Sequence, residues 1–324
     1  MKLLESYLAQ IEQQELQVKQ FPDFVFLCGG PINDKADECK YSVRQFILDR
    51  LFTSSPSLAR RVVLAEQIND WYKDAHFGDL LDFENHLSHL AHTVVLVLES
   101  PGAIAELGAF ALMPSIAEKL FVLMNGEYAQ SNSFIELGPI KFLRDRHDLV
   151  YIYPWGSEKN PVGGPHWIPK TEDVEAILEQ VISDLKTHLE KGRRTATFSG
   201  SDPGHVTLLV CELLSIATTL KLGEIEAALK SLGIRASTKE VRRHLFASEK
   251  LGLVERFEYG HEPFYFGTRQ SGFIKFRLKD GADSWMKDRS RVVVEIANAH
   301  REGGTRHWNA ISLYRKGKKR GMAL

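Results

Sequence analysis

The sequence predicts an α/β protein, a flavodoxin/Rossmann-like parallel sheet domain followed by a winged helix-turn-helix domain. Three observations support this prediction. Short, continuously apolar runs alternate with helical patterns up to residue 190, which is typical of a parallel sheet covered by helices on both faces. After residue 205, three short helical patterns precede a strand–turn–strand pattern, the order of a winged helix-turn-helix. The length of 324 residues suits two domains.

The elements of the first part follow from the spacing of apolar residues. Leucines recur at near-helical intervals over residues 1–20, and Phe24–Cys28 is an apolar run that ends at a glycine pair. Helices are expected over 1–20, 41–52, 79–91, 103–113 and 171–190. Strands are expected over 24–28, 61–65, 93–98, 120–124 and 149–153. We assign residues 1–190 to this first domain.

The second part begins after a polar stretch rich in glycine and serine, residues 191–205, which is expected to be a linker. Helices are expected over 206–220, 224–232 and 238–250, and a ribbon of two strands over 253–257 and 263–266. We assign residues 206–278 to a winged helix-turn-helix domain and residues 279–324 to a basic C-terminal extension.

Composition excludes several classes of protein. With 44% hydrophobic and 26% charged residues the chain is expected to be globular. Its apolar runs, such as residues 93–98, are far shorter than the about 20 residues that span a bilayer, and acids and glutamines near the N-terminus do not fit a signal peptide. Three cysteines, Cys28, Cys39 and Cys211, exclude a disulfide scaffold and a cysteine-based zinc site. We therefore expect a cytoplasmic protein that makes no membrane contact.

Charge is divided unevenly along the chain. The whole chain has a net charge of −1, yet residues 191–324 hold 25 Lys and Arg against 14 Asp and Glu, whereas residues 1–190 hold 16 against 28. Such asymmetry favours two domains with different partners and makes the C-terminal half a candidate for binding nucleic acid. A basic surface that is simply solvated is the alternative.

Two expected strand ends are candidates for a ligand site, because ligands of open parallel sheets bind at the carboxyl ends of strands where the strand order reverses. Gly29 and Gly30 follow the first strand and would let a ligand approach the backbone. After strand 93–98, a Pro101-Gly102 turn is expected to place Glu106 in the first turn of the next helix. The helix dipole favours an ionised carboxylate there, which suits covalent attack on a sugar C1′. Glu106 could instead only stabilise its own helix.

A second carboxylate, Glu84, lies beside Asn85 on the helix expected over 79–91 and would face the same crevice if that helix packs next to strand 93–98. Glycosyl chemistry commonly uses two carboxyl groups, although an exposed glutamate on an amphipathic helix is the alternative. The same helix carries His86 and His89, but their spacing to His92 drifts around the helix and no partner residue has zincin spacing. We expect no metal and no other cofactor.

Three stretches carry a resemblance to a known family. They are Phe26-Leu27-Cys28-Gly29-Gly30, the run from Glu99 to Phe110 (ESPGAIAELGAF), and Ser133-Phe134-Ile135-Glu136-Leu137-Gly138-Pro139. In these stretches the chain resembles bacterial retron effectors, which have an N-terminal domain similar to nucleoside 2-deoxyribosyltransferases and a C-terminal winged-helix DNA-binding domain. The resemblance covers most of residues 20–155, and the second domain matches in architecture more than in residues.

The resemblance implies roles for particular residues. Glu106 corresponds to the nucleophilic glutamate of the transferases, and Glu84 falls on the helix that supplies their sugar-contacting carboxylate. The transferases commonly carry Asp before the Pro-Gly turn, where this chain has Ser100, so hydrolysis is favoured over base exchange. The residues that would contact the substrate are Cys28, Gly29, Gly30, Asn85, Glu99, Ser100, Pro101 and Gly102.

The resemblance further implies a role in anti-phage defence, as a toxin restrained by a reverse transcriptase and its multicopy RNA–DNA hybrid. The expected activity is cleavage of an N-glycosidic bond in a nucleotide such as NAD. A nucleotide-sensing DNA-binding regulator without catalysis is the alternative, and a phosphoribohydrolase-like or nucleotide-recognition module is a third.

Basic residues on the helix expected over 238–250 fit a recognition helix, since phosphate contacts dominate affinity for nucleic acid. These residues are Lys239, Arg242, Arg243 and Lys250. Beyond the ribbon, Arg269, Lys275 and Arg277 and the basic C-terminal residues could add phosphate contacts. A charged, solvated helix is the alternative for each of them.

Overall fold

The computed structural model describes the chain as two compact units. The described residues are 2–32, 41–68, 76–129, 132–160, 167–190, 195–268, 272–303 and 306–321, with side chains up to 318. Residues 23–69 and 91–192 form the unit that we call the sheet unit, and residues 1–22, 70–90 and 193–324 form the helical unit. Cys39 and Arg269 lie outside the described residues.

A five-stranded parallel sheet forms the centre of the sheet unit, which confirms the predicted α/β class with a parallel sheet. Its strands are β2 (Val25–Cys28), β3 (Val62–Val63), β4 (Thr93–Leu98), β5 (Leu120–Asn125) and β6 (Val150–Tyr153). They lie in the order β3-β2-β4-β5-β6, and all neighbouring pairs are parallel. The order reverses between β2 and β4, and the carboxyl ends of these two strands are therefore the first place to look for a ligand site.

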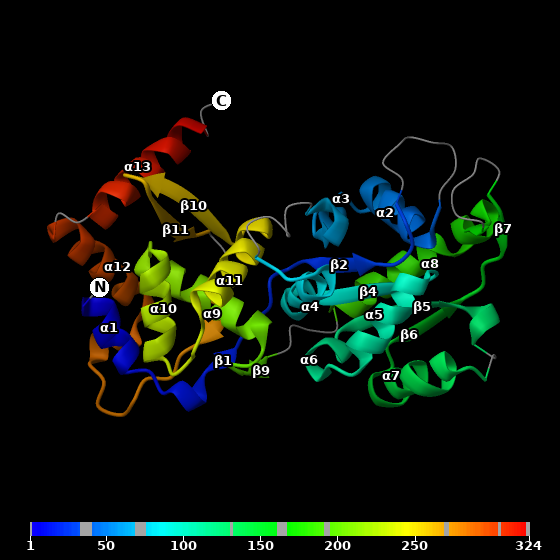
Figure 1. Ribbon diagram of the computed structural model, residues 1–324, viewed down its shortest axis with the longest axis horizontal. Coiled ribbons are helices and arrows are strands. Elements are labelled where there is room, and N and C mark those ends of the chain that lie inside the picture. Colours follow the sequence, from blue (N-terminus) through cyan, green and yellow to red (C-terminus); the bar gives the residue numbers. More distant parts are fainter. Residues whose placement is uncertain are drawn as a thin grey trace. The chain divides into compact units, whose positions relative to one another are not determined.

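Helices cover both faces of this sheet, because successive strand residues point to opposite faces and nearly all of them are apolar. On one face Leu27 and Val97 share a core with α2 (Val43–Ser54) and α8 (Thr171–Glu190). On the other side of the strands Figure 1 shows α5 (Pro101–Ala111), which follows β4. The remaining elements are α3 (Pro56–Ala59), α6 (Pro114–Ala117), a π turn (Glu136–Ile140), α7 (Lys141–His147), β7 (Ser157–Lys159) and β8 (Trp167–Pro169).

The helical unit contains the three helices and the ribbon that the sequence predicts after residue 205. Its helices are α1 (Lys2–Ala9), α4 (Leu80–Leu90), α9 (Pro203–Ala217), α10 (Leu222–Ser231), α11 (Thr238–Lys250), α12 (Arg289–Glu302) and α13 (Arg306–Gly321). Strands β10 (Val254–Tyr259) and β11 (Glu262–Gly267) form an antiparallel ribbon. The two-residue turn Gly260-His261 has positive φ at both positions, as the tightest hairpin turns require. Three short strands, β12 (Ile274–Lys275), β1 (Gln17–Val18) and β9 (Ala196–Thr197), form a small antiparallel sheet.

The structure differs from the sequence prediction at the N-terminal end of the chain and adds helices within the predicted basic extension. The expected N-terminal helix over 1–20 stops at Ala9, and the chain continues into strand β1. The basic extension is folded, since α13 packs on the ribbon, where Tyr314 stacks on Phe266 with 4.0 Å between ring centroids. None of the described helices combines the length and the apolar character that a membrane span requires.

The contacts also divide the chain differently from the predicted boundaries. The prediction placed all of residues 1–190 in one domain, whereas α1 and α4 belong to the compact unit formed by residues after 193. Helix α4 packs along α9. An apolar stripe shows that a helix is covered on one face, but it does not show which distant element covers it.

Candidate functional site

A cavity of about 390 Å³ opens at the carboxyl ends of β4 and β5, and we call it the β4–β5 pocket. Glu99, Ser100 and Pro101, which the sequence predicts as substrate contacts, line one side of it. Ser133 and Ile135, from the third stretch of the family resemblance, line the other. The remaining lining residues, which the sequence analysis missed, are Leu98, Ile104, Met124 and Tyr128. Two stretches that are about thirty residues apart in the sequence thus meet at one cavity.

Ser100 determines where the helix at this pocket begins. Its hydroxyl accepts a hydrogen bond from the amide of Ala103 at 3.2 Å, which caps α5, and Pro101 occupies the first helical position. The Ser100 hydroxyl also donates to the carbonyl of Gly29 at 3.4 Å, so it connects the ends of β2 and β4. Gly102 is exposed and is not a lining residue of the pocket.

Glu106 lies one turn later than the sequence analysis expected. Because the cap is Ser100, Glu106 is the sixth residue of α5 and not part of its first turn. It is three residues after Ala103 and four before Phe110, both buried, so it borders the side of the helix that faces the core. Glu106 is half-buried, and one of its carboxylate oxygens is shielded from solvent. It is not among the described residues that line the β4–β5 pocket.

The glycine pair after β2 is occupied by the protein's own side chains. The Gly30 amide donates to a Glu99 carboxylate oxygen at 3.0 Å. A Cβ atom at Gly30 would lie 2.7 Å from the Cβ of Ser42 and 2.9 Å from the Glu99 carboxylate. At Gly29 a Cβ would lie 3.0 Å from the Val97 side chain. In the structure the pair makes room for Glu99 and its neighbours. A ligand contact at these glycines stays a prediction. Cys28, just before the pair, is buried.

Glu99 is held at the N-terminus of α2. Besides the Gly30 amide, its carboxylate accepts the amide of Val43 at 2.6 Å and the amide of Arg44 at 3.0 Å. Free amides at a helix N-terminus bind anions, and here the anion is a side chain of the same chain. Burial raises the pKa of Glu99 to about 7, against the hydrogen bonds from Arg44, Val43 and Gly30, which lower it.

Arg44 completes this group and is a residue that the sequence analysis missed. It is buried, donates to the carbonyl of Gly30 at 3.2 Å, and forms an ion pair with Glu66 at 2.7 Å. No motif marks it, because its partners come from three separate segments. The arrangement fixes the loop after β2 against α2 and β4.

Glu84 and Asn85 lie in the helical unit, on α4, whereas Glu106 lies in the sheet unit. Asn85 lines a cavity of about 150 Å³ together with His86, Ser201, Arg243 and other residues of the helical unit. The grouping of Glu84 with Glu106 at one crevice therefore stays a prediction.

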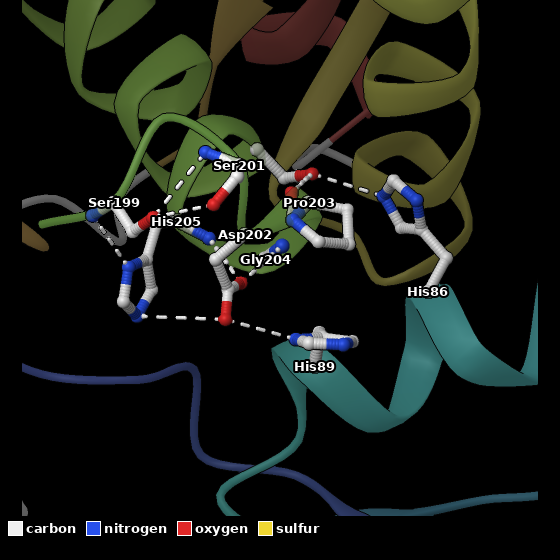
Figure 2. A network of polar contacts seen from close by, with 9 residues as sticks. His86, His89, Ser199, Ser201, Asp202, Pro203, Gly204 and His205 are labelled. Atoms are coloured by element: carbon white, nitrogen blue, oxygen red, sulfur yellow. Dashed lines mark hydrogen bonds and ion pairs between the residues drawn. The ribbon is translucent and has the colours of Figure 1, made fainter. Parts of the chain in front are cut away.

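Figure 2 shows how α4 is attached to α9 through Asp202. Asp202 caps α9 by accepting the amides of Gly204 at 2.9 Å and His205 at 3.1 Å. Its other carboxylate oxygen lies 3.0 Å from Nδ1 of His89 on α4. Burial raises the pKa of Asp202, but the hydrogen bond from His89 and the neighbouring imidazoles outweigh it and hold that pKa well below its usual range. Gly204 permits this approach, since a Cβ there would lie 2.7 Å from the His89 carbonyl oxygen.

A second contact between α4 and α9 runs through Thr207, whose hydroxyl donates to the carbonyl of Pro203. The hydroxyl oxygen of Thr207 is 3.0 Å from Nε2 of His86 and 2.8 Å from Nδ1 of His244 on α11. Burial lowers the pKa of His86 well below 6.5 and that of His244 to about 4, so both rings are neutral at pH 7. Each neutral ring can then donate its N–H to the threonine oxygen.

Comparison with known proteins identifies the family. The model of the STM3845 retron effector protein family matches residues 40–256. The chain belongs to this family. A curated protein of Escherichia coli, "Retron Ec73 putative ribosyltransferase/DNA-binding protein", is 33% identical over 234 residues, which cover 68% of this chain and 71% of that protein. The protein of the same description from retron Ec86 of Escherichia coli is 26% identical over 129 residues, or 37% of either chain.

In this retron effector, His86 and His89 of α4 and His92, which follows the helix, have separate partners. His86 contacts Thr207, His89 contacts Asp202, and His92 contacts Thr93. Within the part of the chain that the structure describes, no three His, Cys, Asp or Glu side chains are grouped so that they could hold a metal ion.

The basic residues predicted on the recognition helix of this retron effector fall into two groups. Lys239, Arg242 and Lys250 are exposed on α11. Arg243 is only 24% exposed, since its guanidinium donates to the carbonyl of His76 at 2.6 Å and pairs with Asp82 at 2.9 Å. Arg243 thus ties α11 to the segment that precedes and begins α4.

Proposed function

We propose that this retron effector cleaves the N-glycosidic bond of a nucleotide, with NAD as the first substrate to test. The observation that carries the proposal is the β4–β5 pocket, where the Glu99–Pro101 and Ser133–Ile135 stretches of the family resemblance line one cavity at the carboxyl edge of a parallel sheet. The description of both curated relatives as ribosyltransferases supports it.

The pocket suits a flat base more than a phosphate. Ile104, Met124 and Tyr128 offer apolar and aromatic surface. Among the described lining residues, the one charged group is the Glu99 carboxylate, which would repel a phosphate. A base such as nicotinamide would occupy the cavity, and the phosphates would lie outside it.

In the proposed reaction, a carboxylate oxygen of Glu106 bonds to C1′ of the sugar while the C1′–N bond breaks. The electrons of the broken bond pass to the base; in NAD they neutralise the nicotinamide ring, so that this leaving group takes no proton. Water then attacks C1′ and the bond between C1′ and Glu106 breaks, which restores the carboxylate. One proton of the water stays on the new sugar hydroxyl and the other passes to solvent. Glu84 is the proposed second carboxylate, which holds the sugar.

The test is Glu106→Gln, which keeps the shape of the side chain and removes its charge. Wild type and variant are incubated with NAD and a panel of nucleotides, and free base is quantified by chromatography. We expect base release to fall by orders of magnitude in the variant. Glu172→Gln, at an exposed position of α8, is the matched control. Equal release from wild type and Glu106→Gln would remove Glu106 from the mechanism.

A second candidate function, a nucleotide-sensing DNA-binding regulator without catalysis, is favoured by the position of Glu106 outside the lining of the β4–β5 pocket. A regulator would bind a nucleotide there and release no base. Equilibrium binding of NAD to wild type with no nicotinamide formed, in the presence of any activating partner, would select this function.

We further propose that α9, α10, α11 and the β10–β11 ribbon act as a winged helix-turn-helix that binds nucleic acid, with Lys239, Arg242 and Lys250 of α11 among the contacts. The partners would be the retron reverse transcriptase and its RNA–DNA hybrid, which restrain the toxin. Cell growth is compared for the effector alone, with both partners, and with the hybrid alone abolished. Identical growth of all three, with the protein abundant, would contradict this control.

A further inference from the structure

A cavity of about 460 Å³ lies in the helical unit, away from α11. It is built from four segments that are far apart in the sequence. They are Tyr7 and Lys19 near the N-terminus, residues between 272 and 278 around β12, residues 286, 287 and 289 around the start of α12, and Glu212 of α9. The pairing of β1 with β12, which sets Gln17 opposite Lys275, brings the first two segments together. We call this cavity the basic pocket.

Positive charge dominates the walls of the basic pocket. Its lining includes Lys19, Lys275, Arg277, Lys287 and Arg289 against a single carboxylate, that of Glu212. The ammonium groups of Lys19, Lys275 and Lys287 form no ion pair with any residue that the structure describes. Three unneutralised cations around one cavity repel each other, and that cost is removed when an anion binds.

The one carboxylate does not compensate these charges. Glu212 is fully buried, and one of its oxygens accepts the amides of Gly272 at 2.7 Å and Phe273 at 2.9 Å. The other oxygen accepts from Nε of Arg289 at 2.9 Å. Arg289 also donates from Nη2 to the hydroxyl of Ser215 at 2.9 Å and keeps 40% of its side chain exposed. Glu212 therefore holds the guanidinium of Arg289 in a fixed orientation at the pocket wall.

The size and the apolar lining of the basic pocket indicate what kind of anion fits. A volume of about 460 Å³ lies within the range of about 300–1,000 Å³ of small-molecule sites, which is room for a nucleotide rather than for one inorganic ion. Phe276 lines the cavity and stands edge-on to Tyr7, with 6.4 Å between ring centroids. Cations combined with an aromatic surface are the usual means of binding a single nucleic-acid strand, whose bases are free to stack.

We propose that the basic pocket binds phosphate groups of a single nucleic-acid strand and forms a second contact, separate from α11. The proposal rests on the nucleic-acid function proposed above and adds a second binding site for the nucleic acid. The two contacts lie on different faces of α9: Thr207 and Cys211 face His244 and Ser248 of α11, whereas Glu212 faces the basic pocket. A nucleic-acid strand bound both at α11 and at the basic pocket would run along the surface of the helical unit around α9.

The test uses the full chain with Lys275→Ala and Lys287→Ala combined, since both side chains are exposed and neither forms an ion pair that the fold would lose. Lys159→Ala with Lys186→Ala, two exposed lysines of the sheet unit, removes the same charge as a control. Affinity for a fluorescent single-stranded 20-mer is measured by anisotropy between 50 and 300 mM salt.

We expect the affinity of the Lys275→Ala, Lys287→Ala variant to fall roughly tenfold at the lowest salt concentration. The slope of log affinity against log salt should become shallower by about 1.4, because each of the two lost phosphate contacts contributes about 0.7 to the slope for a single strand. Wild-type affinity and slope in the basic-pocket variant would overturn the proposal while leaving binding through α11 intact. No binding by wild type would overturn both. Displacement of the 20-mer by a nucleoside monophosphate at an equal nucleotide concentration would show a site for free nucleotides and would overturn the assignment to a strand.

Discussion

The carboxylate of Glu99 accepts the backbone amide of Gly30 at 3.0 Å, directly across the point where the strand order of the sheet reverses. The same carboxylate caps α2 through the amides of Val43 and Arg44. A position that often receives a ligand anion in parallel sheets is filled here by the chain itself. The β4–β5 pocket, which Glu99 also lines, opens next to this position.

Replacing Glu99 with alanine is expected to destabilise the protein by about 1–3 kcal/mol, because three partly buried amides lose their acceptor. The vacated position should then bind a small carboxylate. We expect sodium formate to raise the melting temperature of Glu99→Ala more than that of wild type, in thermal unfolding at constant ionic strength. Glu172→Ala, at an exposed site, is the control. An equal rise in all three proteins would show that formate acts elsewhere.

The raised pKa of Glu99 predicts a dependence of stability on pH. Because the folded-state pKa of about 7 exceeds the ordinary value of 4.5, the folded protein binds this proton more tightly than the unfolded chain does. The contribution of the Glu99 proton to the free energy of unfolding is complete below pH 4.5 and is lost as the pH rises through 7. Urea unfolding from pH 4.5 to 8 should show this loss in wild type, and Glu99→Gln should lack it. The same slope in both proteins would assign the loss to other groups.

Much of the fold was predictable because its signals are local. The apolar run of residues 93–98 is β4 from Thr93 to Leu98, and the helix predicted over 238–250 begins after Ser237, whose reciprocal hydrogen bonds with Glu240 form a capping box. The ribbon turn could be recognised from Gly260, which takes the positive φ that the turn needs.

What could not be predicted depends on contacts between distant residues. The unit to which α4 belongs is decided by Asp202 and Gly204, more than 110 residues after His89. The capping of α2 by Glu99 could not be predicted, because the amide partners of its carboxylate lie 55 to 69 residues earlier in the chain. Helix α13 could not be recognised in its basic sequence, because few apolar residues mark the face that packs on the ribbon. Among the described side chains these are Trp308, Ala310, Ile311 and Tyr314.

Gly204→Ala is expected to destabilise the helical unit by about 1–3 kcal/mol, because its Cβ would overlap the His89 carbonyl and force α4 away from α9. Gly223→Ala is the matched control: Gly223 lies in the first turn of α10, and a Cβ there meets no atom within 4 Å. This control should be neutral or slightly stabilising. Urea unfolding followed by far-UV circular dichroism measures both. A Gly204→Ala variant as stable as Gly223→Ala would show that the two helices adjust without cost.

The buried histidines predict a second pH dependence, in the acid range. The folded-state pKa of His244, about 4, lies below its ordinary value of 6.5, and the pKa of His86 is shifted in the same direction. As the pH falls, the unfolded chain therefore takes up these protons before the folded protein does. The contribution of these histidines to the free energy of unfolding is complete above pH 6.5 and is lost as the pH falls through 4. The loss is about 1.4 kcal/mol per unit of difference between the folded-state and unfolded-state pKa.

His244→Asn should flatten this acid dependence, because the asparagine amide can donate to Thr207 as Nδ1 does but does not titrate. His261→Asn is the control, since His261 is exposed at a turn position with positive φ that asparagine tolerates. Urea unfolding from pH 4 to 7 compares the three proteins. A steep loss in His244→Asn equal to that in wild type would exclude His244 as its source.

The β4–β5 pocket can be tested by filling it. Ile104→Trp places an indole in a cavity of about 390 Å³ from a position that is 43% exposed, so that the fold has room to accept it while a base does not. We expect the release of base from NAD, or from whichever nucleotide the wild type cleaves, to fall roughly tenfold or more at low substrate concentration, with an unchanged melting temperature. Leu112→Trp, just after the end of α5 and 79% exposed, should cleave at the wild-type rate. Wild-type cleavage by Ile104→Trp would move the base site away from this pocket, and a loss shared by Leu112→Trp would point to a general effect of added aromatic surface.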